Sequence, residues 1–143
     1  DQGLIARMAP YLGLKGPAAK AALVRAPLTI TATEAAALDK AVQKDHRDRL
    51  IRRFDAESTI GPFRSLPANT QTALADVYFR YDPDSAHWKT PELWRQVTNG
   101  KWQEAYENLM NFRDREGPRG QAEARLLSRD IQAGSLPQPR RPR

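Results

Sequence analysis

The chain has 143 residues, and its 23 Lys and Arg against 17 Asp and Glu give a formal charge of +6. This length is typical of one domain that buries a core of its own. The sequence contains no cysteine, which excludes disulfide frameworks and thiolate metal sites. A basic protein of this kind attracts polyanions, such as nucleic acid, anionic lipid or an acidic cell-wall polymer.

No apolar run approaches the roughly 20 residues that a membrane-spanning helix needs, so we expect no membrane insertion. Trp88, Trp94 and Trp102 each stand beside a lysine or an arginine, a pattern found on nucleic-acid-binding surfaces. Helical spacing turns the tryptophans inward, however, and leaves the cations facing solvent. We therefore expect no nucleic acid partner.

Short helices are predicted in the first 30 residues. Residues 3–12 place apolar side chains on one helical side, with Pro10 near the end of the segment. Residues 18–24 are strong helix formers, and Pro27 stops them. Residues 28–30 are too few to support a sheet and are expected to be an extended linker.

The longest predicted helix spans residues 32–56. Thr31 and Glu34 have the spacing of a capping box, in which each side chain accepts a hydrogen bond from the other residue's amide. His46 lies in the apolar row of this helix and is expected to be a half-buried structural histidine. The row repeats at i, i+4 and contains Leu38, Val42, His46, Leu50 and Phe54.

A central buried helix is predicted over residues 66–81. Pro67 suits its first turn, and an apolar stripe follows at helical spacing. Ala75 and Phe79 lie off that stripe, so the helix is apolar on more than half of its circumference. Such a helix is typical of the middle of a bundle. The stripe consists of Ala73, Leu74, Val77, Tyr78 and Tyr81.

Three shorter helices are predicted after the central one. They span residues 91–97, 101–112 and 121–133, with Gly100 and Gly134 as stop signals. No segment alternates apolar and polar residues as a half-buried strand does, so the predicted fold class is all-α.

The predicted organisation has three parts: residues 1–30 with short helices, residues 31–134 with the helical body, and residues 135–143. The last part is expected to be a disordered basic tail, because its arginines lie among prolines. These arginines are Arg140, Arg141 and Arg143.

The sequence contains no Gly-rich phosphate loop, no cluster of metal-ligating residues and no recognisable set of nucleophile, base and acid. We therefore expect no metal site and no cofactor. Sequence spacing does not pair any two carboxylates at the separation that a glycosidase requires. Each is expected to have a surface or helix-capping role: Glu57, Asp82, Asp84, Glu92 and Glu123.

Three segments, taken in order and at their spacing, carry a resemblance to a known family. The first is residues 66–74 (LPANTQTAL) followed by 77–81 (VYFRY). The second is residues 94–105 (WRQVTNGKWQEA) followed by 108–112 (NLMNF), and the third is residues 119–127 (RGQAEARLL). Together they resemble the C-terminal lobe of the phage-type lysozyme superfamily, most closely the pesticin-like muramidases. Residues 31–134 would be this lobe with its long linking helix, and residues 1–30 a remnant of the inter-lobe region.

The resemblance implies a lysozyme-like glycoside hydrolase that cuts the β-1,4 link between N-acetylmuramic acid and N-acetylglucosamine. Its implied partners are peptidoglycan glycan strands and an immunity protein. Relatives of this kind serve as antibacterial toxins, secreted effectors or endolysins. The implied place of action is therefore outside the producing cell, by secretion or by delivery to the periplasm or cell wall of target bacteria.

The family's catalytic glutamate lies near the start of the N-terminal lobe, and nothing similar precedes Glu34 here. The chain also starts without Met, so we expect a piece of a longer protein whose catalytic residue lies upstream of Asp1. No residue of this chain is expected to be catalytic. The alternative hypothesis is a non-catalytic glycan-binding or structural helical domain.

The resemblance also implies positions for the binding residues. Phe79, Arg80 and Tyr81 match the end of the central helix that faces the sugar cleft, where the family commonly has Gln in place of Arg80. Arg119 matches an arginine that approaches the catalytic acid from the other lobe, and Glu123 would support the loop that carries it. The family pattern has a second arginine after this one, where the present chain has a glycine.

Overall fold

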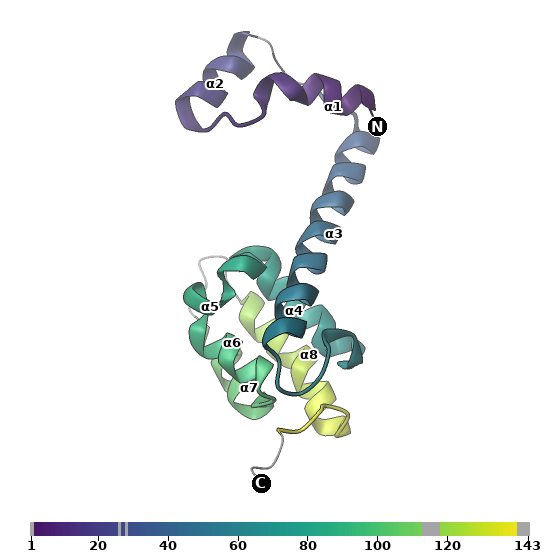
Figure 1. Cartoon of the computed structure of the whole chain (residues 1–143), viewed down its shortest axis with the longest axis vertical. Helices are drawn as coiled ribbons and strands as arrows, with labels where there is room; N and C mark the ends of the chain where they lie inside the picture. Colours follow the sequence, from purple (N-terminus) through teal and green to yellow (C-terminus); the bar gives the residue numbers. More distant parts are fainter. Residues whose placement is uncertain (1, 26, 28, 113–117, 140–143) are drawn as a thin grey trace. The chain divides into compact units, whose positions relative to one another are not determined.

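The computed structural model describes residues 2–25, 27, 29–112 and 118–139, which form helices and no strand. The predicted all-α class is therefore confirmed for this part of the chain. The chain divides into a first unit, Asp1–Val42, and a second unit, Gln43–Arg143 (Figure 1). The boundary falls inside the longest helix and not at residue 30. Across the described ranges, no helix is long and apolar enough to cross a membrane.

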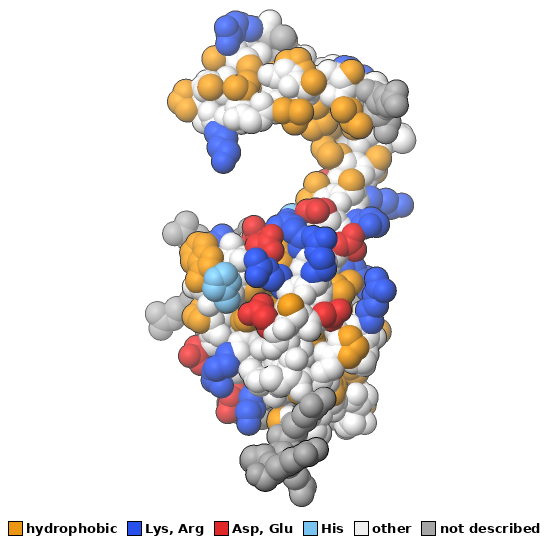
Figure 2. All heavy atoms as spheres, in the orientation of Figure 1, with side chains coloured by type: hydrophobic (Ala, Val, Ile, Leu, Met, Phe, Trp, Pro, Cys, Tyr) orange, Lys and Arg blue, Asp and Glu red, His pale blue; other side chains and the backbone are white. Residues whose placement is uncertain are grey.

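The first unit contains α1 (Gln2–Met8), the 3-10 turn η1 (Ala9–Tyr11), α2 (Gly16–Arg25) and the first part of α3 (Ala32–Glu57). Leu4 is the one large apolar side chain that is buried in its described residues. Many others lie on its surface, which shows as hydrophobic atoms in Figure 2. Because burial of apolar area drives folding, this unit has little stability of its own. The exposed side chains are Ile5, Leu12, Leu14, Leu23, Val24 and Ile30.

The predicted capping box at the start of α3 is confirmed. The Thr31 amide donates to Glu34 Oε1 (3.0 Å), and the Glu34 amide donates to Thr31 Oγ1 (3.1 Å). The guanidinium of Arg7 also binds the Glu34 carboxylate. Hydrogen bonding from the Thr31 amide keeps the pKa of Glu34 below its usual value. Thr31 and Glu34 therefore fix the first turn of this helix.

The second unit is built around α4 (Ala68–Tyr81), as predicted for the central helix. Helix α4 packs against α8 (Arg119–Ala133), and α8 packs against α7 (Trp102–Met110). Helix α6 (Pro91–Thr98) packs on α7, and the short α5 (Ala86–Lys89) packs on α6 (Figure 1). The buried face of α4 consists of Thr70, Ala73, Leu74, Val77 and Tyr78.

Two carboxylates of α8, seven positions apart, hold opposite ends of α4. At the N-terminal end, Asp130 accepts hydrogen bonds from the Thr70 amide (2.8 Å) and the Thr70 hydroxyl (2.7 Å). It also accepts a hydrogen bond from the Asn69 amide group (3.3 Å). Asp130 thus satisfies a free amide in the first turn of α4. The other contact, made by Glu123, is part of the candidate site.

Aromatic rings join α3 to this helical body. The Phe54 ring packs edge-on against Phe63 in the 3-10 turn η2 (Phe63–Ser65), with centroids 5.6 Å apart. It also packs edge-on against Trp94, which in turn contacts Tyr78 at 5.2 Å. Leu50 and Phe54 are buried, His46 is half-buried as predicted, and Val42 is exposed. The predicted apolar row of α3 is therefore core only in its C-terminal part.

Ion pairs also fix α3 against the 3-10 turn η3 (Pro83–Ser85). Arg49 Nη1 binds Asp82 (2.7 Å) and Asp84 (3.0 Å), and Arg53 Nε binds Asp84 (3.0 Å). Hydrogen bonds from these arginines hold the pKa of Asp84 below its usual value. Acidic and basic side chains are interspersed on the face of the second unit seen in Figure 2.

Gly120 allows α8 to lie close to α7. A Cβ atom at this position would lie 2.7 Å from the Leu109 carbonyl oxygen and 2.9 Å from Phe112 Cβ. Both distances are shorter than side chains tolerate, so only glycine fits this crossing. Helix α8 begins at Arg119, two residues before the start predicted from the sequence.

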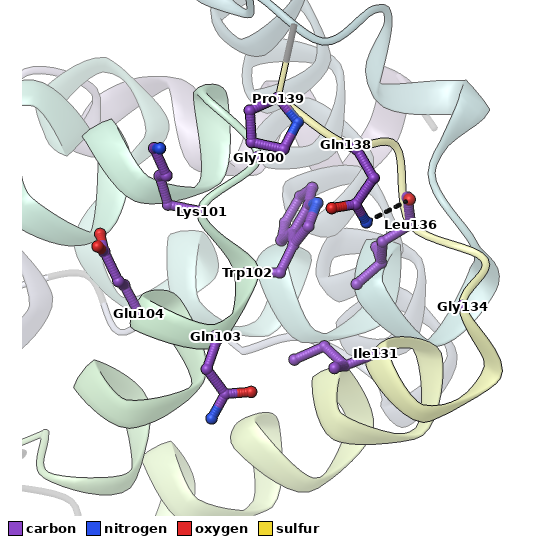
Figure 3. A pocket seen from close by; sticks show the side chains of 10 residues that line it. All are labelled: Gly100, Lys101, Trp102, Gln103, Glu104, Ile131, Gly134, Leu136, Gln138 and Pro139. Atoms are coloured by element: carbon purple, nitrogen blue, oxygen red, sulfur yellow. Dashed lines mark hydrogen bonds between the residues drawn. The ribbon is translucent and has the colours of Figure 1, made fainter. Parts of the chain in front are cut away.

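Residues 135–139 lie against the start of α7, although they were expected to belong to a disordered tail (Figure 3). Leu136 is buried, and the Trp102 indole N–H donates to the Pro137 carbonyl oxygen (2.8 Å). The segment is held there because the apolar side chain of Leu136 packs beside Trp102. The charge and proline content of the segment do not predict this contact. The remaining residues of the predicted tail, 140–143, lie outside the described residues.

The prediction that all tryptophans point inward is wrong for Trp88. Trp94 and Trp102 are 4 % exposed, but Trp88 is 62 % exposed. It lies on α5, a four-residue helix that was not predicted and that has only one buried position, Ala86. Lys89 Nζ lies 5.2 Å from the centre of the Trp88 ring, so the pair forms a cation–π contact at the surface.

Replacing Leu50 with alanine should lower the free energy of unfolding by about 2–5 kcal/mol, because this fully buried side chain would leave a cavity. Leu12→Ala is the matched control: Leu12 is 69 % exposed, and its loss should change the stability by less than about 0.5 kcal/mol. Urea denaturation followed by circular dichroism measures both. Equal losses in the two variants would contradict the placement of the core in the second unit.

Candidate functional site

The second unit has a groove of about 390 Å³ between α3, α4 and the first residue of α8. Leu50 and Tyr78, both buried, form its floor. Phe79 and Arg119, which the family resemblance assigns to substrate binding, both line it. The full lining is Gln43, His46, Arg47, Leu50, Thr72, Ala75, Asp76, Tyr78, Phe79 and Arg119.

An aromatic pair forms one part of the groove wall. Phe79 is 43 % exposed, although it belongs to the otherwise buried central helix. Its ring lies 5.1 Å from the His46 ring of α3, at an interplanar angle of 48°. The two rings support each other from neighbouring helices and leave part of Phe79 open to solvent. An exposed ring beside a groove offers a flat apolar surface on which the face of a sugar ring can pack.

A carboxylate and an arginine form another part of the wall. Arg119 Nη2 donates to Asp76 Oδ1 at 2.8 Å, and both side chains are about 40 % exposed. Asp76 Oδ2 also accepts a hydrogen bond from Arg80 Nη1 (3.3 Å). Asp76 therefore lies between an arginine at the surface and one in the interior, and it holds Arg119 at the groove.

Arg80 lies in the interior and not in the groove. Its side chain is 6 % exposed and that of Glu123 is 2 % exposed. The guanidinium makes two hydrogen bonds with the carboxylate, Nη2 to Oε1 at 2.8 Å and Nη1 to Oε2 at 3.1 Å. This bidentate geometry is the strongest form of an arginine–carboxylate contact. Arg80 thus joins α4 to α8. Its contact with substrate, which the resemblance implies, stays a prediction, and the buried position of the side chain does not favour it.

Glu123 acts on the groove through a chain of contacts. It binds Arg80, which binds Asp76, which binds Arg119. The supporting role inferred for Glu123 stays a prediction; among the described residues, Glu123 reaches Arg119 through Arg80 and Asp76. Burial raises the pKa of Glu123 to about 7, and the opposing effect of Arg80 is not large enough to cancel it.

Tyr81 lies apart from the groove. Its ring packs edge-on against Phe112, with centroids 5.6 Å apart. It lines a different hollow together with Lys89, Asn108 and Asn111. The structure therefore does not bring Tyr81 together with Phe79 and Arg119, although the three were predicted to share a substrate-binding surface.

The contribution of α3 and of Asp76 to the groove was not predicted from the sequence. A signal was present: Thr72, Ala75, Asp76 and Phe79 recur at i, i+3, i+4 and i+7, which places them on one face of α4. Ala75 and Phe79 were placed off the buried stripe, but because they are apolar they indicated only a helix that is apolar over more than half of its circumference, and not the wall of a groove.

A second hollow, of about 320 Å³, lies beside the C-terminal segment (Figure 3). Trp102, Ile131 and Leu136 give it apolar walls, and Gln138 Nε2 donates to the Leu136 carbonyl at 3.2 Å. None of the predicted binding residues lines it. We therefore take the groove between α3 and α4 as the candidate site.

The described helices form an all-α lobe that carries a groove. The family model described as "Pesticin: Bacterial toxin homologue of phage lysozyme, C-term" matches residues 1–103. Because this match covers more than half of the chain, the chain belongs to the Pesticin family, as the resemblance predicted. No curated protein matches the chain. The family match ends before Arg119 and Glu123, so their assignment depends on the third segment of the resemblance and on the contacts given above.

Removing one partner of the buried ion pair should be costly. Arg80→Met should lower the free energy of unfolding by about 3–5 kcal/mol at pH 7.5, because Glu123 would remain buried without its cation. The double variant Arg80→Met/Glu123→Leu removes both charges and should regain most of that loss. Urea denaturation of the two variants provides the comparison. A single variant that is as stable as the double one would show that the pair does not hold α4 to α8.

The titration of Glu123 should differ from that of an ordinary glutamate. Its pKa is about 7 in the folded protein against 4.5 in the unfolded chain. Between these values the folded state binds more protons, so stability should fall as pH rises from about 4.5 to about 7. Carbon-13 NMR of the side-chain carboxyl, assigned with Glu123→Gln, measures the midpoint. A midpoint below 4.5 would show that Arg80 outweighs the effect of burial.

Proposed function

We propose that the chain is the helical lobe of a peptidoglycan-degrading muramidase of pesticin-like type. In this proposal the groove between α3 and α4 holds a glycan strand, and the whole enzyme cuts the β-1,4 link after N-acetylmuramic acid. Membership of a toxin family homologous to phage lysozyme carries the proposal. The general acid comes from a segment outside these residues.

The chemistry of the groove supports the binding of a sugar. Carbohydrates are recognised through apolar ring faces and through many hydroxyl and amide groups. The groove offers the exposed ring of Phe79 for the former. For the latter it offers the amide of Gln43, the hydroxyl of Thr72 and the carboxylate of Asp76. Apolar surface with a few polar groups is the usual composition of a ligand site.

The carboxylates at and behind the groove do not fit the role of general acid. Both oxygens of Asp76 accept hydrogen bonds from arginines, whereas a general acid has to donate a proton to the glycosidic oxygen. Glu123 has a raised pKa, as such an acid would, but it is 2 % exposed and its oxygens bind Arg80. The part of the protein that we assign to this lobe therefore binds and orients the substrate.

The same proposal places the site of action at the cell wall of target bacteria, after secretion or delivery. The net charge of +6 suits an anionic wall, because long-range attraction brings the protein to it and salt weakens that attraction. An immunity protein that protects the producing cell is a further partner of this proposal.

A turbidity assay on purified peptidoglycan tests the proposal. The chain by itself should bind peptidoglycan in a pull-down but should not clear the suspension, since it supplies no general acid. The full-length protein from the same gene should clear it. Clearing by the chain alone would contradict the placement of the acid elsewhere. Binding without clearing by the full-length protein would favour the non-catalytic glycan-binding alternative.

A pair of aromatic variants tests whether the groove is the binding site. Phe79→Ala should weaken binding to peptidoglycan by roughly tenfold, because a stacked ring contributes on the order of 1 kcal/mol beyond its buried area. Trp88→Ala is the matched control, because Trp88 is an exposed aromatic residue that does not line the groove. A larger loss with Trp88→Ala would move the binding surface to α5.

A further inference from the structure

Arg47 of α3 is held in place at the edge of the groove. It lines the groove and is exposed, and its Nη2 donates to Gln71 Oε1 at 3.2 Å. The Gln71 side chain is itself fixed, because its Nε2 donates to the backbone carbonyls of Leu66 (2.7 Å) and Arg64 (3.2 Å). This fixed amide positions the guanidinium and leaves its other N–H groups available to a ligand.

The charge of Arg47 has no acidic partner among the described residues. Arg49, Arg53, Arg80 and Arg119 all form ion pairs with aspartate or glutamate side chains. Arg47 bonds only to the neutral amide of Gln71. In the groove, the charge of Arg119 is balanced by Asp76, so the uncompensated positive charge lies on the α3 side.

The aromatic wall and this charge line the same groove. His46 precedes Arg47 on α3, and its ring contacts Phe79 in the wall of the groove. Gln71, to which Arg47 is bonded, precedes Phe79 by eight residues on α4, or about 12 Å along the helix. A glycan strand that packs one ring on Phe79 and extends along the groove would therefore bring the substituents of another of its sugars to the guanidinium of Arg47. The two sugars of peptidoglycan differ in the charge of their substituents. N-acetylglucosamine is neutral, whereas N-acetylmuramic acid carries a lactyl ether that ends in a carboxylate or in a peptide stem.

We propose that Arg47 binds a carboxylate of the muramic acid substituent and so makes the groove selective for peptidoglycan over neutral polymers of N-acetylglucosamine. This inference rests on the proposed function and adds a substrate preference to the groove that holds the glycan. The recognised chemistry is a carboxylate, which either the lactyl group or the peptide stem can supply. A planar guanidinium fits a carboxylate through two parallel N–H···O bonds, and a glutamine does not.

The test compares the binding of defined saccharides to the chain by isothermal titration calorimetry. The probes are a peptide-free tetrasaccharide of alternating N-acetylglucosamine and N-acetylmuramic acid, the same compound with methyl-esterified carboxylates, and the neutral tetramer of N-acetylglucosamine. The chain should bind the free acid about tenfold more tightly than the ester or the neutral tetramer. Arg47→Gln should remove this preference but retain the affinity for the neutral tetramer.

Two further variants act as controls. Arg52→Gln removes the same charge from an exposed position of α3 outside the groove and should keep the preference. Arg47→Lys keeps the charge without the planar fork and should retain part of it. Higher salt should reduce the preference for the free acid and leave the binding of the neutral tetramer unchanged.

The outcomes separate this inference from the function on which it rests. Equal binding of acid, ester and neutral tetramer would overturn the role of Arg47 and leave a glycan-binding groove in place. An equal loss of preference with Arg52→Gln would also overturn it, because net charge alone would then explain the effect. Binding of none of the saccharides, with or without a peptide stem, would overturn the proposed function itself. A preference that appears only with a peptide-bearing disaccharide, and that Arg47→Gln removes, would support the inference with the stem as the source of the carboxylate.

Discussion

The contact between Arg80 and Glu123 joins the interior of the second unit to its groove. Both side chains are almost completely withdrawn from water, so each makes the burial of the other tolerable. Arg80 also reaches Asp76, and Asp76 holds Arg119 at the surface. The orientation of a groove residue therefore depends on an ion pair that lies in the interior and does not line the groove.

Helices α4 and α8 are fixed to each other at two levels. Asp130 binds the first turn of α4 through Thr70, and Glu123, two helical turns earlier on α8, binds Arg80 near the end of α4. The apolar contacts between the helices lie between these polar ones. Helix α3 is held independently, by its buried aromatic side chain and by the ion pairs of Arg49. The three elements that line the groove are thus each anchored to the core, which favours a groove that exists before a ligand arrives.

Much of the fold follows from local signals in the sequence. Capping residues, prolines and glycines mark helix ends through the nearest few residues, so the capping box at Thr31 and the end of α4 before Pro83 were predictable. The short helix α5 and the 3-10 turns have too few residues for periodicity to reveal them. The direction of Trp88 was predicted wrongly for this reason, because it was inferred from helical spacing in a segment too short for that spacing to apply.

The site was less predictable than the fold, because its contacts join distant parts of the chain. Phe79 and Arg119 were found through the family resemblance, which indicates positions and not partners. Arg80 is 43 residues away from Glu123 in the sequence, and no spacing rule connects two such residues. The groove face of α4 carries alanine and phenylalanine, and composition alone does not distinguish such a face from a buried one.

The close crossing of α7 and α8 at Gly120 limits which residues this position accepts. In the resemblance described above, a second arginine corresponds to Gly120, yet the Leu109 carbonyl and the Phe112 side chain occupy the space that any larger residue would need. An arginine is compatible with the position only if the two helices separate, and Arg119, the neighbouring residue, would then shift relative to Asp76. Charge and helix spacing are therefore coupled at this position, because a residue that adds a positive charge also requires a wider crossing. A homologue with an arginine at this position should also differ in the residues that face it across the crossing.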